Sequence, residues 1–256
     1  MKKILNDPFD YVDEMLAGLC LAHPEYYRQL GSDGKVIARP EAPIKGKVGL
    51  VCGGGSGHLP VFTGYVGKGL LDACAIAGMV YAFKMAGAKA EEMADLEAVA
   101  SIAQKAVDAC RSIGVALTPC TVPAAGRPTF EIGEDEMEIG MGIHGEPGVR
   151  RGPLKSADDI AEEMLAIILA DMPLASGTRV SVLCNSLGAT PPEELYIVYR
   201  YVARSLAKLG VEIVMPLVGR YATSMEMMGM SITVCRLDDE LEKLLKAPCD
   251  CAFWRV

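Results

Sequence analysis

The sequence predicts an α/β protein, because short apolar runs of strand length alternate with longer segments of helical periodicity. Of its 256 residues, 51% are hydrophobic and 23% are charged, which is ample material for a core. The length suits one large α/β domain or two small ones. Neither an internal repeat nor a low-complexity segment interrupts the pattern.

Charge and cysteine content narrow the class of protein further. A net charge of −8 and a pI near 5.0 disfavour nucleic acid or an anionic membrane as partner. The start of the chain does not resemble a signal peptide, and no apolar run has the length of a membrane span, so we expect a cytoplasmic protein. Its nine cysteines contain no CxxC pair and are expected to be reduced and buried. Cys249 and Cys251 are the closest pair. A metal site formed by these two is less favoured than reduced, buried thiols, because no histidine is nearby in sequence.

The N-terminal region predicts one helix followed by a connector. Asn6-Asp7-Pro8 supplies a capping residue and a proline suited to the first turn. His23 precedes a proline at the expected helix end, and we interpret it as a structural or surface residue. Glycines and prolines in residues 31–46 indicate a connector. The apolar positions that predict the helix are Phe9, Val12, Met15, Leu16 and Leu19.

Residues 48–58 combine a predicted strand with a glycine loop. Residues 48–52 have the length and composition of a fully buried strand. Four glycines follow within five residues, and their bare N–H groups favour anionic or strongly polar oxygens. His58 stands where the loop re-enters regular structure, a common place for a site in an open α/β fold. The alternative is a tight turn that His58 merely caps.

The middle of the chain predicts two helices and a short strand. Residues 76–93 are rich in alanine and methionine and have helical character. Asp95 is the expected cap of the second helix, and residues 115–117 are the strand candidate. The apolar face of the second helix is expected to comprise Leu96, Val99, Ile102, Ala103, Ala106, Val107 and Cys110.

The last hundred residues predict two further helices and three strands. A helix is expected from about 156 to 170 and strands at 178–184, 212–217 and 232–235. Thr190, followed by Pro191 and then Glu193, reads as the capping box of the second helix, and Gly210 is expected to end it. Its buried stripe is predicted to comprise Leu195, Val198, Val202, Leu206 and Leu209.

A second histidine lies in residues 135–148, DEMEIGMGIHGEPG. Read as a strand, one face carries Met137, Ile139, Met141 and Ile143, and the other carries Glu136, Glu138, Gly140, Gly142 and His144. Glycine inside a strand costs stability, so the glycines around His144 indicate that something packs closely there. A structural role for His144 is the alternative. A neutral imidazole can act as general base or attack a carbonyl carbon, and a reversible covalent bond would hold a ligand too small to bind by burial.

Six motifs in order resemble one family, the substrate-binding subunit of dihydroxyacetone kinase (the DhaK family). The resemblance covers nearly all of the chain and implies an α/β fold with a mixed or parallel sheet flanked by helices, in a homodimer. The motifs are GGGSGH at 53–58, GYVGKG at 64–69, ALTPCTVPAAGRP at 116–128, EMEIGMGIHGEPG at 136–148, LGATPPEELY at 187–196 and TSMEMMGMSIT at 223–233.

The resemblance also implies a mechanism. His144 would form a hemiaminal with the ketone of dihydroxyacetone, and His58 would take part in acid–base work on its hydroxyl. Gly55, Ser56 and Gly57 would line the substrate pocket with His58. This chain would bind no cofactor, because ATP or another phosphorylated donor is held by a partner subunit. That division of labour fits the absence of a G-x-x-x-x-G-K-[ST] loop.

The chain departs from the family in its N-terminal half. A deletion seam is expected near residues 72–80, so residues 1–74 would be a remnant of the N-terminal lobe and 75–256 the C-terminal lobe. The missing portion carries the family's K-N-Y-x-G-D motif, whose lysine and aspartate contact the substrate. Leu59 also stands where the family often has glutamate, and Asn185-Ser186 replaces a paired asparagine.

Three functions are therefore open. The chain is a ketone kinase subunit that presents a short-chain ketone to a nucleotide-bearing partner, or a non-catalytic ketone-binding paralogue used for sensing or regulation. The third is a scaffold whose site is no longer used, or a sequence that has been shortened. The sequence does not distinguish dihydroxyacetone from glyceraldehyde, erythrulose or a related sugar.

Overall fold

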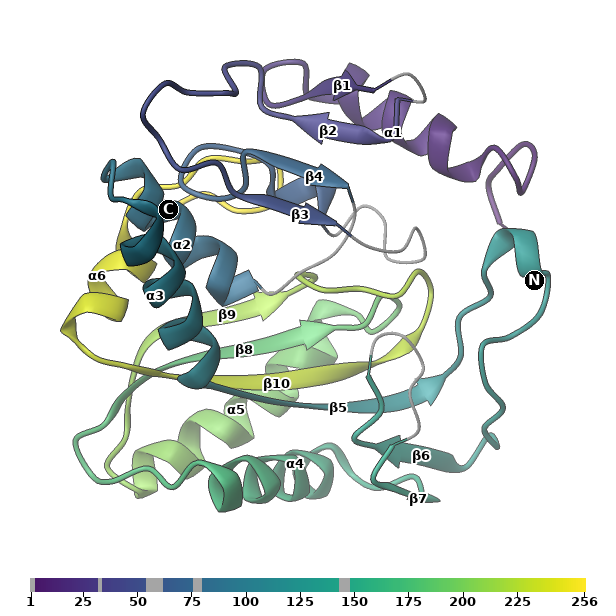
Figure 1. Cartoon of the computed structure of the whole chain (residues 1–256). Coiled ribbons are helices and arrows are strands. Elements are labelled where there is room, and N and C mark those ends of the chain that lie inside the picture. The colour runs from purple at the N-terminus through teal and green to yellow at the C-terminus, as the bar shows by residue number, and fades with distance from the viewer. Residues whose placement is uncertain (1–2, 32–33, 54–61, 76–79, 143–147) are drawn as a thin grey trace. The chain divides into compact units, whose positions relative to one another are not determined.

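The computed structural model describes residues 3–31, 34–53, 62–75, 80–142 and 148–256 (Figure 1). It divides into two compact units. The first unit comprises Met1–Asp108 and Asp239–Val256, and the second comprises Ala109–Asp238. This division after Asp108 differs from the seam expected near residues 72–80, which concerns what the chain lacks relative to the family and stays a prediction.

The first unit contains a four-stranded sheet in the order β1-β2-β4-β3. β1 (Arg28–Leu30), β2 (Val36–Ala38) and β4 (Ala73–Ala75) are antiparallel neighbours, and β3 (Val51–Gly53) runs parallel to β4. The predicted buried strand at 48–52 is wrong, because β3 begins at Val51 and that side chain is 71% exposed. Val48 and Leu50 are instead half-buried against a small cluster of helix residues.

Among the described residues of the first unit, the α-helices are α1 (Tyr11–Ala22), α2 (Val80–Glu91), α3 (Leu96–Asp108) and α6 (Asp239–Lys246). α2 packs against both α3 and α6. The predicted cap of α3 is confirmed, since the Asp95 carboxylate accepts a hydrogen bond of 2.8 Å from the Ala98 N–H. The buried Lys84 ammonium of α2 donates to two carbonyl oxygens at the end of α6, those of Leu244 and Ala247.

The second unit contains a mixed six-stranded sheet in the order β7-β6-β5-β10-β8-β9. All neighbouring strands are antiparallel except β8 and β9, which are parallel. The strands are β5 (Cys110–Thr118), β6 (Glu136–Ile139), β7 (Arg150–Pro153), β8 (Arg179–Ser186), β9 (Glu212–Gly219) and β10 (Met228–Leu237).

Helices α4 (Ala157–Asp171) and α5 (Pro192–Lys208) lie together on one face of this sheet (Figure 1). Their apolar stripes pack against alternate residues of β5, β8 and β10 to form the main core of the unit. Ser156 caps α4 by accepting a hydrogen bond from the Asp159 N–H. A mixed sheet flanked by helices confirms the predicted α/β fold class.

Several predicted helix boundaries are wrong. α1 begins at Tyr11 rather than near Pro8. Cys110 opens β5 instead of extending the face of α3. Thr190 does not cap α5, because its hydroxyl donates to the Gly229 carbonyl and accepts from the Gly229 N–H. The cap position is Pro191, without a side-chain hydrogen bond.

The predicted stripe of α5 is confirmed at four of its positions and wrong at the fifth. Leu195, Val198, Val202 and Leu206 are buried, whereas Leu209 lies beyond the helix and is exposed. The chain turns away at Gly210, whose φ of +72° favours glycine.

Candidate functional site

The predicted site residues lie on two segments outside the described residues. These are the segment 54–61, with Gly55, Ser56, Gly57, His58 and Leu59, and the segment 143–147, with His144. Their roles stay predictions. The structure describes the chain on either side of each segment.

The segment with His144 connects two paired strands. β6 and β7 form an antiparallel hairpin in which Ile139 lies opposite Arg150. The predicted strand is wrong at residues 140–142, because β6 ends at Ile139 and Gly140 has a φ of +89°. Ile143 and His144 lie outside the described residues. Met137 and Ile139 point into the main core as expected.

Glycines at both ends of the segment permit close backbone contact. The Gly140 N–H donates to the Gly114 carbonyl at 2.7 Å. A Cβ atom on Gly114 would lie 2.6 Å from the Met141 carbonyl oxygen, and one on Gly148 would lie 2.6 Å from that of Ile139. Of the glycines behind the predicted close packing, Gly140 shows it, because a Cβ atom there would lie 2.6 Å from the Cγ2 atom and 2.7 Å from the backbone nitrogen of Val149. Gly145 lies outside the described residues.

A buried carboxylate joins the two arms of the hairpin. Glu138 on β6 accepts a hydrogen bond of 2.6 Å from the Gly148 N–H and two from the Arg151 guanidinium, at 2.9 and 2.7 Å. The Gly148 hydrogen bond lowers the pKa of Glu138, and Arg151 lowers it further against the opposing effect of burial. The charged form of Glu138 therefore helps to hold the first arm against the second.

Side chains from four of the sequence motifs meet beside this hairpin. Met141 packs in one buried cluster with Ala116, Cys120, Leu187 and Met227. Met141 belongs to the motif at 136–148, and both Ala116 and Cys120 belong to the motif at 116–128. Leu187 belongs to the motif at 187–196 and Met227 to the motif at 223–233. The motifs that carry the resemblance thus share a common packing site next to the connection that bears His144.

Asn185 and Ser186 end β8 with a set of hydrogen bonds to loops. The Asn185 side-chain oxygen accepts from the N–H groups of Tyr221 and Ala222, both at 2.8 Å, and its amide donates to the Ala222 carbonyl. The Ser186 hydroxyl donates to the Thr190 carbonyl. In the sequence this pair stands out as a departure from the family. Its position, two polar residues at the end of an apolar strand, is the sequence feature that indicates its structural role.

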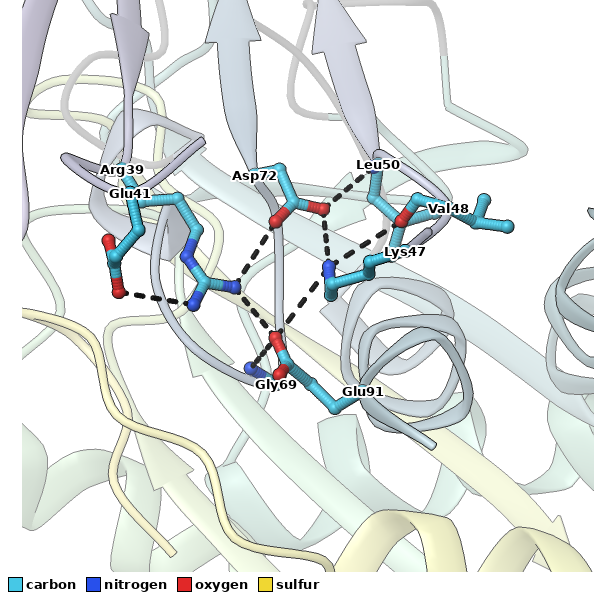
Figure 2. A network of polar contacts seen from close by, with 8 residues as sticks. All are labelled: Arg39, Glu41, Lys47, Val48, Leu50, Gly69, Asp72 and Glu91. Atoms are coloured by element: carbon cyan, nitrogen blue, oxygen red, sulfur yellow. Dashed lines mark hydrogen bonds and ion pairs between the residues drawn. The ribbon is translucent and has the colours of Figure 1, made fainter. Parts of the chain in front are cut away.

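In the first unit, an ion-pair network holds the strand that precedes the glycine loop (Figure 2). The Asp72 carboxylate accepts from the Lys47 ammonium at 2.6 Å, from the Leu50 N–H at 2.9 Å and from the Arg39 guanidinium at 3.1 Å. Asp72 immediately precedes β4, and Leu50 immediately precedes β3. The network therefore anchors the parallel pair β3–β4 at the end where both strands begin.

Glu91 at the end of α2 completes this network. Its carboxylate accepts from the Arg39 guanidinium at 2.6 Å and from the Gly69 N–H at 3.3 Å. Burial raises the pKa of Glu91, but the Arg39 and Gly69 hydrogen bonds outweigh that effect and the net shift is downward. Burial likewise disfavours the Arg39 charge, yet Glu91 and Glu41 raise the Arg39 pKa on balance.

The sequence did not indicate this network, because Arg39 falls in the predicted connector at 31–46 and Lys47 directly follows it. A cavity of about 240 Å³ lies beside it, lined by Arg28, Lys47 and Asp72 and otherwise largely by apolar residues such as Ile44 and Val48. The network is best understood as the support for the glycine-loop strand.

Cys249 and Cys251 do not have the character of metal ligands. Both thiols are buried and donate weak hydrogen bonds to the Trp254 carbonyl. Burial raises the pKa of Cys251 to about 11 and also raises that of Cys249, which opposes the thiolate form that binds metals. Within the described part of the chain, no cluster of three or more metal-binding side chains is found.

Two further features bear on the early expectations. His23 follows α1 at its C-terminal end, where its N–H donates to the Leu19 carbonyl, and this agrees with the structural role expected of it. No helix among the described residues is both long and apolar enough to cross a membrane.

The fold and the flanks of the site define an α/β protein with a glycine loop after one strand and a histidine-bearing hairpin in a mixed sheet. The chain belongs to the Dak1 domain family, which matches residues 17–82 and 74–253. The two matched segments meet at residues 74–82, close to the predicted seam.

Relatives match over the full length of the chain. It is 35% identical to the dihydroxyacetone-binding subunit DhaK of a PTS-dependent dihydroxyacetone kinase of Listeria innocua, with 100% of both chains covered. It is 34% identical to the corresponding subunit of the PEP-dependent enzyme of Escherichia coli, with 97% of both covered. The first alignment spans 330 positions, so part of that relative has no counterpart among the 256 residues here.

Solved structures show the same fold. The dihydroxyacetone kinase operon co-activator Dha-DhaQ matches with a TM-score of 0.86 at 24% identity, covering 94% of this chain and 98% of that one. The dihydroxyacetone kinase of C. freundii matches with a TM-score of 0.85 at 24% identity, covering 99% of this chain and 61% of that one.

Proposed function

We propose that this protein is the substrate-binding subunit of a kinase that acts on dihydroxyacetone or a related short-chain ketone. The observation that carries the proposal is its full-length similarity, at 34–35% identity, to two subunits named for dihydroxyacetone binding. Similarity at 32% to the L-erythrulose kinase of Pectobacterium atrosepticum, of which the chain covers 56%, extends the candidate substrates to other short ketoses.

In this proposal His144 holds the ketone through a covalent bond. A neutral imidazole nitrogen attacks the ketone carbon, the carbonyl π bond opens, and the imidazole proton ends on the former carbonyl oxygen, which gives a hemiaminal. The bond compensates for the small surface that a three-carbon ligand offers. The hydrogen bonds of Glu138 to Gly148 and Arg151 support this role, because they join the two described arms between which His144 lies in the sequence.

His58 acts in this proposal as an acid–base group on the substrate hydroxyl, with Gly55, Ser56 and Gly57 lining the pocket beside it. The phosphoryl group comes from ATP or another phosphorylated donor on a partner subunit, and this chain binds no nucleotide. The protein works as a homodimer. The PTS- and PEP-dependent names of the relatives support a phosphorylated carrier as the ultimate donor.

The second candidate is a ketone-binding protein without kinase activity. The absence of a K-N-Y-x-G-D motif from the sequence favours it. General acid–base groups commonly contribute about 10²–10⁴ in rate, so phosphoryl transfer without that aspartate would be very slow unless another residue replaces it.

Two measurements on the full chain test these candidates. The first is the ¹³C NMR signal of dihydroxyacetone labelled at the ketone carbon, which moves to the position of a tetrahedral carbon if the hemiaminal forms. We expect this change in the parent and in the control His23→Asn, and its loss in His144→Asn.

The second measurement is product formation with a nucleotide-bearing partner subunit and ATP, or with a phosphorylated carrier. A hemiaminal together with phosphorylated ketone supports the kinase subunit. A hemiaminal without product, at high protein concentration and with both donors, supports the binding protein instead. Failure of dihydroxyacetone and erythrulose to form an adduct would overturn both.

A further inference from the structure

Two cysteines of the second unit face each other across neighbouring strands. Cys110 opens β5 and Cys235 lies near the end of β10, and the register places the two directly opposite. Both are present as free thiols.

The backbone hydrogen bonds between β5 and β10 show whether Cys110 and Cys235 form a hydrogen-bonded or a non-hydrogen-bonded pair. The Arg236 N–H donates to the Ala109 carbonyl at 2.9 Å, which joins the residue after Cys235 to the residue before Cys110. In an antiparallel sheet that bond flanks a non-hydrogen-bonded pair, in which the Cα atoms are about 4.5 Å apart and the side chains are closest. A disulfide requires a Cα separation of roughly 4.4–6.8 Å, so the backbone already meets this condition.

The next pair of the same type behaves as this geometry requires. Ser112 and Thr233 lie opposite each other two residues along both strands, on the same face of the sheet. Their hydroxyl oxygens are 2.6 Å apart. Side chains in this set of pairs therefore meet directly across the two strands.

We propose that Cys110 and Cys235 form a peroxide-sensitive dithiol that oxidises to a cross-strand disulfide. Cys110 is half-buried and so offers a sulfur to solvent, whereas Cys235 is fully buried. This exposure assigns Cys110 as the thiol that reacts first and Cys235 as the one that resolves it.

The oxidation takes place in two balanced steps with a hydroperoxide as the oxidant. The Cys110 sulfur, after losing its proton, attacks one oxygen of hydrogen peroxide. The O–O bond breaks, and a sulfenic acid and one water are formed. The Cys235 sulfur then displaces the hydroxyl group as a second water, and the S–S bond forms. Two thiols lose two electrons in total and the peroxide gains them.

The direction of the Cys235 pKa supports this order. The neighbouring Cys110 raises the pKa of Cys235, and burial raises it further. Cys235 therefore keeps its proton, which suits the thiol that reacts second.

The position of the pair determines what the disulfide would do. The second unit spans Ala109–Asp238, so Cys110 is its second residue and Cys235 lies close to its last. A bond between them closes almost the whole unit into one loop. Cross-links that close long loops restrict the unfolded chain most, so oxidation should stabilise this unit.

The test treats the reduced full-length chain with hydrogen peroxide, blocks remaining thiols with iodoacetamide and maps the peptides by mass spectrometry. We expect one cross-linked species, lighter by about 2 Da, that joins the peptides of Cys110 and Cys235. Its thermal midpoint should rise by about 5 °C or more over the reduced chain. A dithiol reductant should reverse both changes.

Variants separate this inference from random oxidation. Cys235→Ser should lose the cross-link and accumulate sulfinic acid at Cys110, whereas the matched control Cys20→Ser, on α1, should cross-link as the parent does. The chain unfolded in urea should not favour this pair. Cross-links joining other cysteines, or none while Cys110 remains open to alkylation, would overturn the proposal.

Discussion

Replacing Glu138 by glutamine removes the carboxylate that joins the two arms of the β6–β7 hairpin. The Glu138 side chain is 8% exposed and accepts hydrogen bonds from the Gly148 N–H and from two nitrogens of Arg151. Glutamine has the same length but a single neutral acceptor, and its amide hydrogens would face donors. At least one of the three hydrogen bonds is therefore lost.

The magnitude follows from the exposure of the two partners. A hydrogen bond to a charged group contributes roughly 1.5–3 kcal/mol to stability. Arg151 is 45% exposed, so solvent weakens the ion pair and the lower part of that range applies. We expect Glu138→Gln to lower the free energy of unfolding by about 2 kcal/mol.

This contribution also depends on pH in a defined direction. The folded state lowers the pKa of Glu138, chiefly through the Gly148 hydrogen bond, below the value of about 4.3 in an unfolded chain. The stabilisation is therefore complete above that unfolded value and is lost as the pH falls through the folded pKa. The difference between parent and variant should shrink in acid.

The assay is urea denaturation of parent and Glu138→Gln at neutral and at acid pH, with Glu134→Gln as the control. Glu134 lies four residues earlier in the chain and is exposed, so its replacement should change stability by less than about 0.5 kcal/mol. Equal stability of Glu138→Gln and Glu134→Gln at neutral pH would refute the role given to Glu138. So would a difference that grows in acid.

Two other predictions concern the first unit. Gly87→Ala on α2 should destabilise the protein by about 1–3 kcal/mol, because the new Cβ would lie 2.5 Å from the Gly69 carbonyl oxygen. In the control Gly18→Ala on α1, the new Cβ meets nothing within 4 Å, and the protein should be stabilised by up to about 1 kcal/mol. Thermal unfolding checks both, and a stabilising Gly87→Ala would contradict the packing. Lys84→Met should cost about 2 kcal/mol, since two carbonyl oxygens at the end of α6 lose their charged donor. Amide exchange of α6 should then be faster, and unchanged exchange would count against this role.

Local signals predicted the elements whose causes are local. Asp95 caps α3 as predicted, because a side-chain oxygen at a helix start binds an N–H only a few residues away. The buried positions of α5 followed from periodicity, since a helix on a sheet buries one face wherever the sheet lies. The order of these elements was enough to predict an α/β fold.

Local signals failed where a distant partner decides. Thr190 has the sequence context of a cap, but it binds Gly229, which comes 39 residues later. Glu138 looked like the polar face of a strand, yet it is a buried link between two arms. In both cases the side chain forms its hydrogen bonds with a residue that the fold brings close, and the spacing in the sequence does not indicate that residue.

The sequence by itself determined the α/β class, most of the helices and the family, because these depend on periodicity, caps and ordered motifs. Only the tertiary structure decided that Gly140 and Gly148, which flank the segment with the predicted anchor His144, lie in close contact with the protein's own chain. The same holds for the support that Arg39, Lys47, Asp72 and Glu91 together give the strand before the glycine loop. The reason is physical: hydrogen bonds and ion pairs between residues far apart in the chain form only when the fold brings them together.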